Sequence, residues 1–392
     1  MNTKRIVFRK EVMDNLRDRR TLLSALLLGP LFGPILFAFM INLSLKQSIT
    51  DATEPLDLPV IGVEHAPNLV SYLKSRNIEL IEPPADRDAA IDAVETGVHD
   101  VVVVIPATFG EDLASMVPAT VEVISDQANR TAEREARRAT RALQAYNQEL
   151  AVLRLTARGV NPTVMRPLNI DMVDVSTPSG RSAILLGMLS YFFLFALLTG
   201  GMNLAIDATA GERERGSLEP LLCLPVRRDD LIFGKIFAAC LFMALSLSLS
   251  LVSFHVTLKF VPLEDLGMTP NFGLDVVAKA WLLLVPFALV GAALMTLVAS
   301  FTKSYKEAQT WVSVVLLAPT LPILVVSILQ VRATTPLMIV PSLSQHLLLV
   351  GLVRNEPVNL PHVAVSVTGT LLAGVLLTLL CARLYRREGL LG

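Results

Sequence analysis

Charge and cysteine are both scarce in this chain. Asp, Glu, Lys and Arg make up 18% of its 392 residues, below the roughly 25% of an average soluble domain, and the formal net charge is -1. A nearly neutral chain has no strong attraction for phosphate backbones, so we expect no nucleic-acid partner. The three cysteines, Cys223, Cys240 and Cys381, lie outside residues 44–180, which excludes a disulfide framework or a Cys-rich zinc site there.

Two kinds of chemical site are also missing from the sequence. There is no G-x-x-x-x-G-K-[ST] phosphate-binding loop, because the Gly234-Lys235 pair lacks the upstream glycine spacing. The five histidines show no metal-ligand spacing, so we predict no metal site and no catalytic residues. On this basis the chain should not hydrolyse ATP, and we do not expect it to be an enzyme by itself.

Long apolar runs are abundant instead, and hydrophobic residues make up 53% of the chain. A helix needs about 20 apolar residues to cross a hydrocarbon core of roughly 30 Å. The sequence therefore predicts an α-helical polytopic membrane protein with six transmembrane helices. The predicted spans are 21–43, which we read as an uncleaved anchor, and about 182–206, 231–258, 276–301, 309–330 and 360–383.

Two shorter segments belong to the membrane region without spanning it. Residues 1–20 are basic and amphipathic, which predicts a helix on the cytoplasmic membrane surface in contact with anionic lipid, or else a disordered basic leader. Residues 336–352 are apolar but short and are broken by Pro341. They predict a re-entrant or interfacial helix that surrounding protein shields from lipid.

Residues 44–180 form one polar insert between the first and second predicted spans. Strand-like apolar runs alternate with helix-like stretches, and a long Ala-, Arg- and Glu-rich stretch follows them. This alternation predicts an inserted α/β domain large enough to bury its own core. The strand-like runs are Leu58–Val63, Ile78–Ile81, Val101–Ile105 and Thr120–Ile124, and the long helical stretch is Arg130–Arg158.

The distribution of Lys and Arg in the short loops predicts the orientation. The loops 207–230 and 302–308 and the two ends of the chain are rich in basic residues, whereas the opposite short loops hold only Lys259, Arg332 and Arg354. Basic loops stay in the cytoplasm. Both termini are therefore predicted to be cytoplasmic and the α/β domain extracytoplasmic, with the remaining five spans in residues 181–392.

The segment 211–235, GERERGSLEPLLCLPVRRDDLIFGK, carries the functional signal. It holds a tight mixed-charge cluster followed by a short amphipathic turn, on the predicted cytoplasmic side. Such a segment suits docking of a soluble partner, although a solvated surface loop has the same composition. Its charged residues, within the segment 207–230, include Glu212, Arg213, Glu214, Arg215 and Glu219.

The segment closely resembles the cytoplasmic signature of type-2 ABC exporter permeases, roughly G-E-x-E-x-G-T-L-E-x-L-L-x-x-P-V-x-R followed by G-K. Ser217 stands where the signature has Thr. The run from Phe8 to Arg20 looks like the start of the NatB-like permeases, a group associated with sodium export. The resemblance covers nearly the whole chain, and its motifs are more specific for the permease class than for the substrate.

The resemblance implies that a separate ABC ATP-binding subunit binds ATP and Mg²⁺ and docks on this chain, against the leader helix and the helix at 211–222 of the cytoplasmic coupling segment 207–230. The docking candidates that it implies are Glu212, Glu214 and Glu219, with Arg213 and Arg215 as alternates. It further implies a permease dimer in a complex of two permeases and two ATPases, in a bacterial cytoplasmic (inner) membrane. Sodium is the substrate that the group suggests, and a drug, lipid or peptide is the alternative within the class. A membrane-anchored sensor or scaffold with an external ligand-binding domain is the alternative of another class, although it would not need the segment 211–235.

Polar residues inside the spans are the remaining candidates, for a substrate pathway. Asn203 and Asp207 lie one helical turn apart, and Asp207 could bind a cation or pair with a nearby Arg. Four hydroxyl residues fall on one face of the third span, where they suit either close helix packing or a polar pathway. They are Ser246, Ser250, Ser253 and Thr257.

Overall fold

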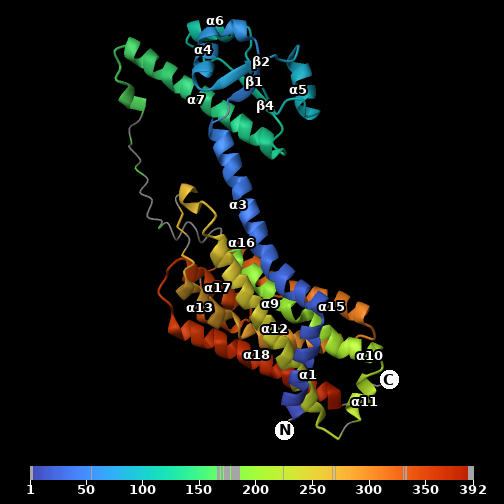
Figure 1. Ribbon diagram of the computed structural model, residues 1–392. Helices are drawn as coiled ribbons and strands as arrows, with labels where there is room; N and C mark the ends of the chain where they lie inside the picture. Colours follow the sequence, from blue (N-terminus) through green and yellow to red (C-terminus); the bar gives the residue numbers. More distant parts are fainter. Residues whose placement is uncertain are drawn as a thin grey trace. The chain divides into compact units, whose positions relative to one another are not determined.

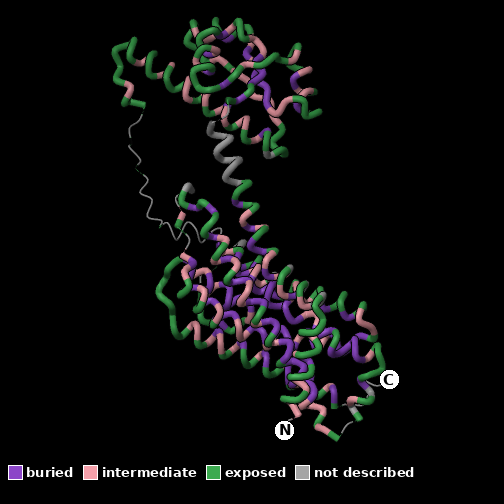
Figure 2. The backbone as a smooth tube through the Cα atoms, in the orientation of Figure 1, coloured by how far each residue is buried: buried purple, intermediate pink, exposed green. Residues whose placement is uncertain are grey.

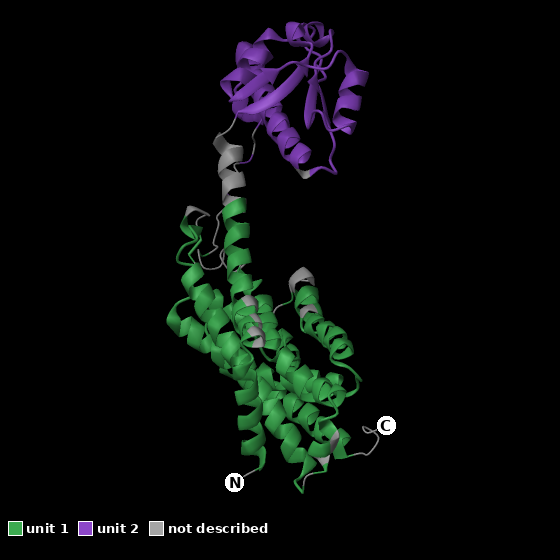
Figure 3. Ribbon diagram, turned by 45° about the vertical axis from the view of Figure 1, so that its right-hand side comes forward, with its two compact units in different colours: residues 1–44, 174–392 green, residues 45–173 purple. Residues whose placement is uncertain are grey.

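The computed structural model describes residues 3–53, 55–165, 168, 171, 177, 186–223, 225–266, 268–269, 271–329, 331 and 333–386 (Figure 1). The chain divides into two compact units (Figure 3). The helical unit comprises Met1–Ser44 and Asp174–Gly392, and the α/β unit comprises Leu45–Val173. The predicted boundary at residues 180 and 181 lies outside the described residues.

The α/β unit is built on a four-stranded sheet with the strand order β2-β1-β3-β4. Strand β1 runs parallel to β2 and β3, whereas β4 runs antiparallel to β3. Because consecutive side chains of a strand point to opposite faces, Val101 and Val103 join one core and Val102 joins the other. The strands are β1 (Leu56–Ile61), β2 (Ile78–Ile81), β3 (Val101–Val104) and β4 (Glu122–Ser125).

Helices cover both faces of this sheet. Helix α5 (Arg87–Glu95) packs Ala90 and Val94 against one face. The other face is covered by α4 (Pro67–Ser75), α6 (Phe109–Ala114) and α7 (Arg130–Ala157). Each strand-like run predicted from the sequence coincides with a strand to within two residues, because β-branched apolar residues fill the runs and turn-forming residues separate them.

The helical unit contains four described helices long and apolar enough to cross a membrane: Leu189–Glu214, Arg228–Thr257, Tyr305–Val326 and Leu360–Arg386. A fifth candidate is the pair α13 (Leu274–Leu284) and α14 (Phe287–Ser300), which bends by 41° between the two helices. In the first predicted span the apolar helix is the shorter Gly29–Leu43. The described residues therefore show a polytopic membrane protein with four or five candidate spans, and six remains a prediction.

The centre of the helical unit is the contact between α9 (Leu189–Ile206) and α12 (Arg228–Thr257). Figure 2 shows the buried residues of this unit gathered along its inner helices. An added Cβ on Gly200 would lie 2.3 Å from Ser246 Cβ and 2.9 Å from the Phe242 carbonyl oxygen, so only glycine allows this approach. By contrast, α18 (Leu360–Arg386) exposes apolar side chains such as Leu372 and Leu376, as a lipid-facing helix would.

The segment predicted as re-entrant or interfacial is a 3-10 turn, η6 (Thr335–Ile339), followed by α17 (Leu343–Val353). The 11 residues of α17 extend about 16 Å, too short to cross a membrane. Gln345 Nε2 donates to Thr370 Oγ1 at 2.7 Å, and Gln345 Oε1 accepts from the backbone N–H of Ser342 at 2.6 Å. Buried hydrogen bonds thus fix this helix within the bundle, and its re-entrant or interfacial placement stays a prediction.

Candidate functional site

The coupling segment continues directly from α9. The α-helix becomes a π-helical turn, η4 (Asp207–Gly211), and then a short α-helix, α10 (Glu212–Glu214). The chain reverses at Gly216, whose φ of 65° is the left-handed conformation that glycine adopts without strain. Helix α11 (Leu218–Leu222) follows, and α12 begins at Arg228.

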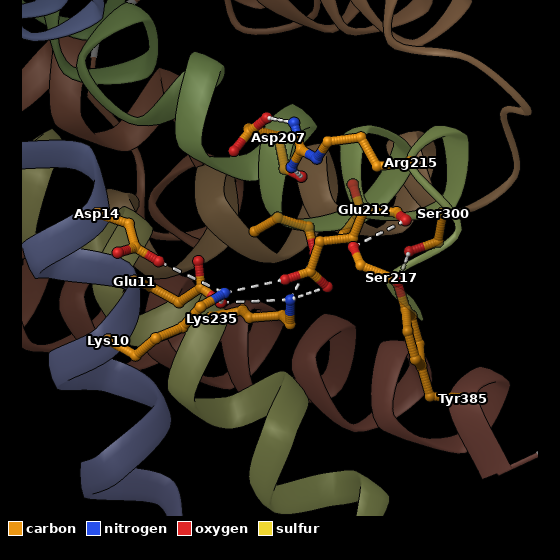
Figure 4. A network of polar contacts seen from close by, with 12 residues as sticks. Lys10, Glu11, Asp14, Asp207, Glu212, Arg215, Ser217, Lys235, Ser300 and Tyr385 are labelled. Atoms are coloured by element: carbon orange, nitrogen blue, oxygen red, sulfur yellow. Dashed lines mark hydrogen bonds and ion pairs between the residues drawn. The ribbon is translucent and has the colours of Figure 1, made fainter. Parts of the chain in front are cut away.

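Four charged side chains meet where the coupling segment touches its neighbours (Figure 4); we call them the charge cluster. They are Lys10 and Glu11 from α1 (Thr3–Arg17), Glu212 from α10 and Lys235 from α12. Lys235 Nζ lies 2.5 Å from Glu212 Oε2 and 3.4 Å from Glu11 Oε1. Lys10 Nζ lies 3.0 Å from Glu11 Oε1 and 3.1 Å from Glu212 Oε1.

Burial makes the balance of this cluster important. Glu11 and Glu212 are each 6% exposed and Lys235 is 2% exposed, so water does little to solvate these charges. The buried ammonium group of Lys235, together with that of Lys10, whose side chain is 49% exposed, balances the two buried carboxylates. Burial alone would lower the pKa of Lys10, but Glu11 and then Glu212 outweigh this and raise the pKa above its ordinary value.

Beside the charge cluster lies a cavity of about 730 Å³, which we call the acidic cavity. Five carboxylates and one guanidinium line it, so its potential is negative. The guanidinium of Arg215 pairs with one of these carboxylates, with Nη1 2.8 Å from Asp207 Oδ1. The lining residues are Glu11, Asp14, Asn15, Asp18, Asn203, Leu204, Asp207, Gly211, Glu214, Arg215 and Tyr305.

The structure places the predicted docking residues differently from one another. Glu212 is buried and points toward Lys235, so it is not itself on the surface, and its part in docking stays a prediction. Arg213 is half-buried and donates from Nη1 to the Thr302 carbonyl at 2.7 Å. Glu214 and Arg215 are exposed, and the side chain of Glu219 lies outside the described residues.

Glu214 also shapes the neighbouring helix. Its Oε2 accepts a hydrogen bond of 2.6 Å from the backbone N–H of Tyr305, the first residue of α15 (Tyr305–Leu317). The first N–H groups of a helix lack partners within it, so this carboxylate ties α10 to the start of α15. A movement of α10 would therefore displace the start of α15 through this hydrogen bond.

The predicted pathway residues also fall into two places. Asn203 and Asp207 both line the acidic cavity. Ser246 and Ser250 are buried; Ser246 Oγ donates to the Ala196 carbonyl of α9 at 2.6 Å, and Ser250 Oγ has no hydrogen-bond partner among the described residues. Ser253 and Thr257 are partly buried farther along the same helix. At Ser246 the hydroxyl contributes to the close packing of two helices.

Sequence reasoning missed the part that α1 plays in this site. Glu11, Asp14 and Asp18 follow one another at spacings of three and four residues, which places them on one helix face. That spacing was a usable signal, but the basic residues of the same segment dominated its interpretation. Sequence reasoning used Lys235 only together with Gly234, as part of a motif. The residues next to it in the sequence do not predict its two carboxylate partners, Glu11 and Glu212.

Apolar candidate spans with a charged coupling segment between two of them are typical of the membrane subunit of a transporter. The sequence profile of the ABC-2 family transporter proteins matches residues 20–383, so the chain belongs to this family. It is similar to the ABC transporter permease protein NatB of Bacillus subtilis (strain 168), with 28% identity over 320 residues, 81% of this chain and 80% of the relative. The resemblance drawn from the segment 211–235 is thereby confirmed, and membership implies an ABC ATP-binding partner.

Proposed function

We propose that this chain is the translocation subunit of an ATP-driven exporter whose ATP and Mg²⁺ are bound by a separate subunit. The proposal depends on one observation about the coupling segment. The segment exposes Glu214 and Arg215 on one side, and ion pairs of Glu212 on its other side anchor it to α1 and α12. Force applied to the exposed side would reach the surface helix α1 and the candidate spanning helix α12 without an intervening flexible linker.

The mechanism follows from a shift between two packed states. ATP binding draws two ATP-binding subunits together, and each pushes on one coupling segment. Two ATP-binding subunits need two such segments, so the proposed assembly is a permease homodimer with two ATPase subunits. The tie between Glu214 and the start of α15 would pass the movement to a further helix.

The proposed location is a bacterial cytoplasmic (inner) membrane, with both termini cytoplasmic and residues 44–180 outside. The exposed side of α1, which includes Arg5 and Arg9, would contact anionic lipid, while its other side packs on α12. Basic residues on the cytoplasmic side support this orientation. The coupling segment then faces the compartment that contains ATP.

Sodium is the substrate we propose, and the acidic cavity supports it. Carboxylate and amide oxygens are the ligands that hard cations prefer, and Asn203 and Asp207 offer both at the end of α9. Because Asp207 pairs with Arg215, a cation would compete with that guanidinium for the carboxylate. The negative potential of the cavity would concentrate cations near the cytoplasmic end of the bundle. Export of a drug, lipid or peptide is the alternative, in which the cavity serves only partner docking.

Affinity purification in mild detergent, followed by mass spectrometry, tests the subunit proposal. We expect an ATP-binding subunit in equal amount with the native chain, and a loss of about tenfold or more with Glu214→Lys or Arg215→Glu. Lys279→Glu, a charge reversal at an exposed position of α13 where Lys279 pairs with Asp275, is the matched control. A permease-only preparation of the native chain across several detergents would contradict the proposal and favour the sensor or scaffold class.

Inside-out membrane vesicles test the substrate. We expect ATP-dependent uptake of ²²Na⁺ that Asp207→Asn reduces while ATP hydrolysis continues. Lys306→Met, on the exposed face of α15, serves as the control. No sodium uptake, together with ATP hydrolysis that an amphiphile stimulates, would replace sodium by the alternative substrate class.

A further inference from the structure

The π-helical turn η4 separates α9 from the coupling segment. A π-helical turn holds one residue more than an α-helical turn, and such turns are uncommon because α-helical hydrogen bonding is preferred. Since each residue of an α-helix advances the direction by about 100°, the extra residue decides which side chains of α10 face outward. The π-helical turn therefore needs a contact that holds it in place.

Lys235 supplies that contact. Its Nζ donates to the Ala208 carbonyl inside η4 at 2.7 Å and to Glu212 Oε2, just after η4, at 2.5 Å. One side chain thus joins the interior of the turn to the helix that follows it. Lys235 is 2% exposed, so water does not compete for these hydrogen bonds.

Helix α1 closes over this contact. An added Cβ on Gly234 would lie 2.8 Å from Val7 Cβ and 3.1 Å from the Lys4 carbonyl oxygen, so the glycine lets α1 approach α12 closely. That approach places Glu11 3.4 Å from Lys235. The two residues of the Gly234-Lys235 pair thus have complementary roles: the first admits α1, and the second fixes η4.

We infer that Lys235 is a positioning residue that holds the π-helical turn, and thereby keeps Glu212 inward and Glu214 and Arg215 outward for the ATP-binding subunit. The inference rests on the proposed function. Without Lys235, η4 relaxes to a regular α-helix. Each side chain that follows η4 then takes the direction of a neighbouring position, about 100° around the helix axis. Glu212 then leaves its buried place, and the docking side chains no longer face the partner as before.

A simpler role for Lys235 would be that of counter-ion to Glu11 and Glu212. The two roles differ in the hydrogen bond to Ala208. In the variant Lys235→Met with Glu212→Gln, Lys10 still balances Glu11, so no uncompensated buried charge remains, but the contact with Ala208 is lost. A counter-ion role predicts native behaviour for this double variant, and a positioning role predicts a defect.

Deletion of Ala210 distinguishes the roles further. Removing one residue from η4 converts the π-helical turn to an α-helical turn. The side chains of α10 keep their native directions, because the deleted residue is the extra one of the π-helical turn. In the double variant, this deletion should restore the native orientation of the coupling segment without Lys235. Deletion of Ala293 in the regular helix α14 is the matched control. It rotates the residues of α14 after position 293 and should not restore the orientation of the coupling segment.

Two readouts are measured, the first on the permease alone and the second on its complex with the ATP-binding subunit. We expect the double variant to unfold in detergent at a lower temperature, and its complex to hydrolyse ATP with a stimulation by the permease reduced about tenfold. Deletion of Ala210 should return both values close to native.

Native values in the double variant, or a defect that the deletion does not correct, would overturn the inference. Failure of the native chain to bind an ATPase would overturn the proposed function, and the unfolding temperatures would still decide the role of Lys235.

Discussion

Glu11, Glu212 and Lys235 show how single charged residues act in this protein. All three are buried, and removing one partner of such a group is expected to cost about 3–5 kcal/mol because the others stay uncompensated. The sequence predicted Glu212 as a docking residue, and the structure shows that its side chain is buried against Lys235. Its contacts could not be predicted locally, since Lys10 and Glu212 lie 202 positions apart.

Glu135 on α7 provides a residue-scale prediction about pH. Its carboxyl pKa is raised first by burial and next by Asp100, Asp57 adds to the effect, and Arg138 and Arg134 oppose it. A raised folded-state pKa stabilises the α/β unit below the unfolded carboxyl pKa of about 4.3, and this contribution is lost as pH rises through the folded-state pKa. We therefore expect Glu135→Gln to slow amide hydrogen exchange in β3 at pH 7.

The same experiment at about pH 3.5 is the internal comparison, since Glu135 is then protonated in both the folded and the unfolded state. Glu95→Gln, an exposed substitution at the end of α5, is the control and should change exchange at neither pH. An equal effect of Glu135→Gln at both pH values would show that the carboxyl charge is not the cause.

At the scale of whole elements, the sequence predicted the strands better than the spans. The Val-rich run 101–105 can form only one kind of buried element, and β3 occupies it. Hydropathy predicted a single span at 276–301, but the helix breaks next to Pro286, which has no N–H for the helical ladder. The hydropathy of residues 276–301 could not predict this break, because hydropathy does not take into account that Pro286 lacks a backbone N–H.

The contact of α9 with α12 gives a prediction at this scale. Gly200→Ala places a methyl group 2.3 Å from Ser246 Cβ, so the helices must separate, at an expected cost of about 1–3 kcal/mol. Thermal unfolding in detergent should show a lower melting temperature. Gly351→Ala in α17 is the control, because its added methyl group would lie 3.4 Å from Glu356 Oε2, an ordinary van der Waals distance. Equal melting temperatures for the two variants would contradict the close packing.

At the scale of the whole molecule, the sequence predicted a polar insert and an apolar bundle, and the structure divides into two compact units, Leu45–Val173 and the remainder of the chain. The acidic cavity was not predictable, because it joins α1, the end of α9 and the start of α15. No local pattern places Asp14 beside Asp207 and Tyr305. Only the packing of the helices brings these residues together.

Labelling with a membrane-impermeant maleimide in intact cells tests the proposed orientation. Cys223, exposed in the loop after α11, should stay unlabelled until the membrane is permeabilised. A cysteine introduced by Val98→Cys, at a position 70% exposed in the α/β unit, should be labelled at once. The opposite pattern would invert the topology and place the coupling segment outside, away from ATP.

Site-specific photo-cross-linking tests most directly the claim that this permease is driven through its coupling segment. A photoreactive amino acid is placed at Arg215 in the full chain, and at Leu372 on exposed α18 as the control. The account predicts an adduct with an ATP-binding subunit from position 215 and none from position 372. An ATPase adduct from position 372 alone, or no ATPase adduct from position 215 while the two proteins co-purify, would contradict it.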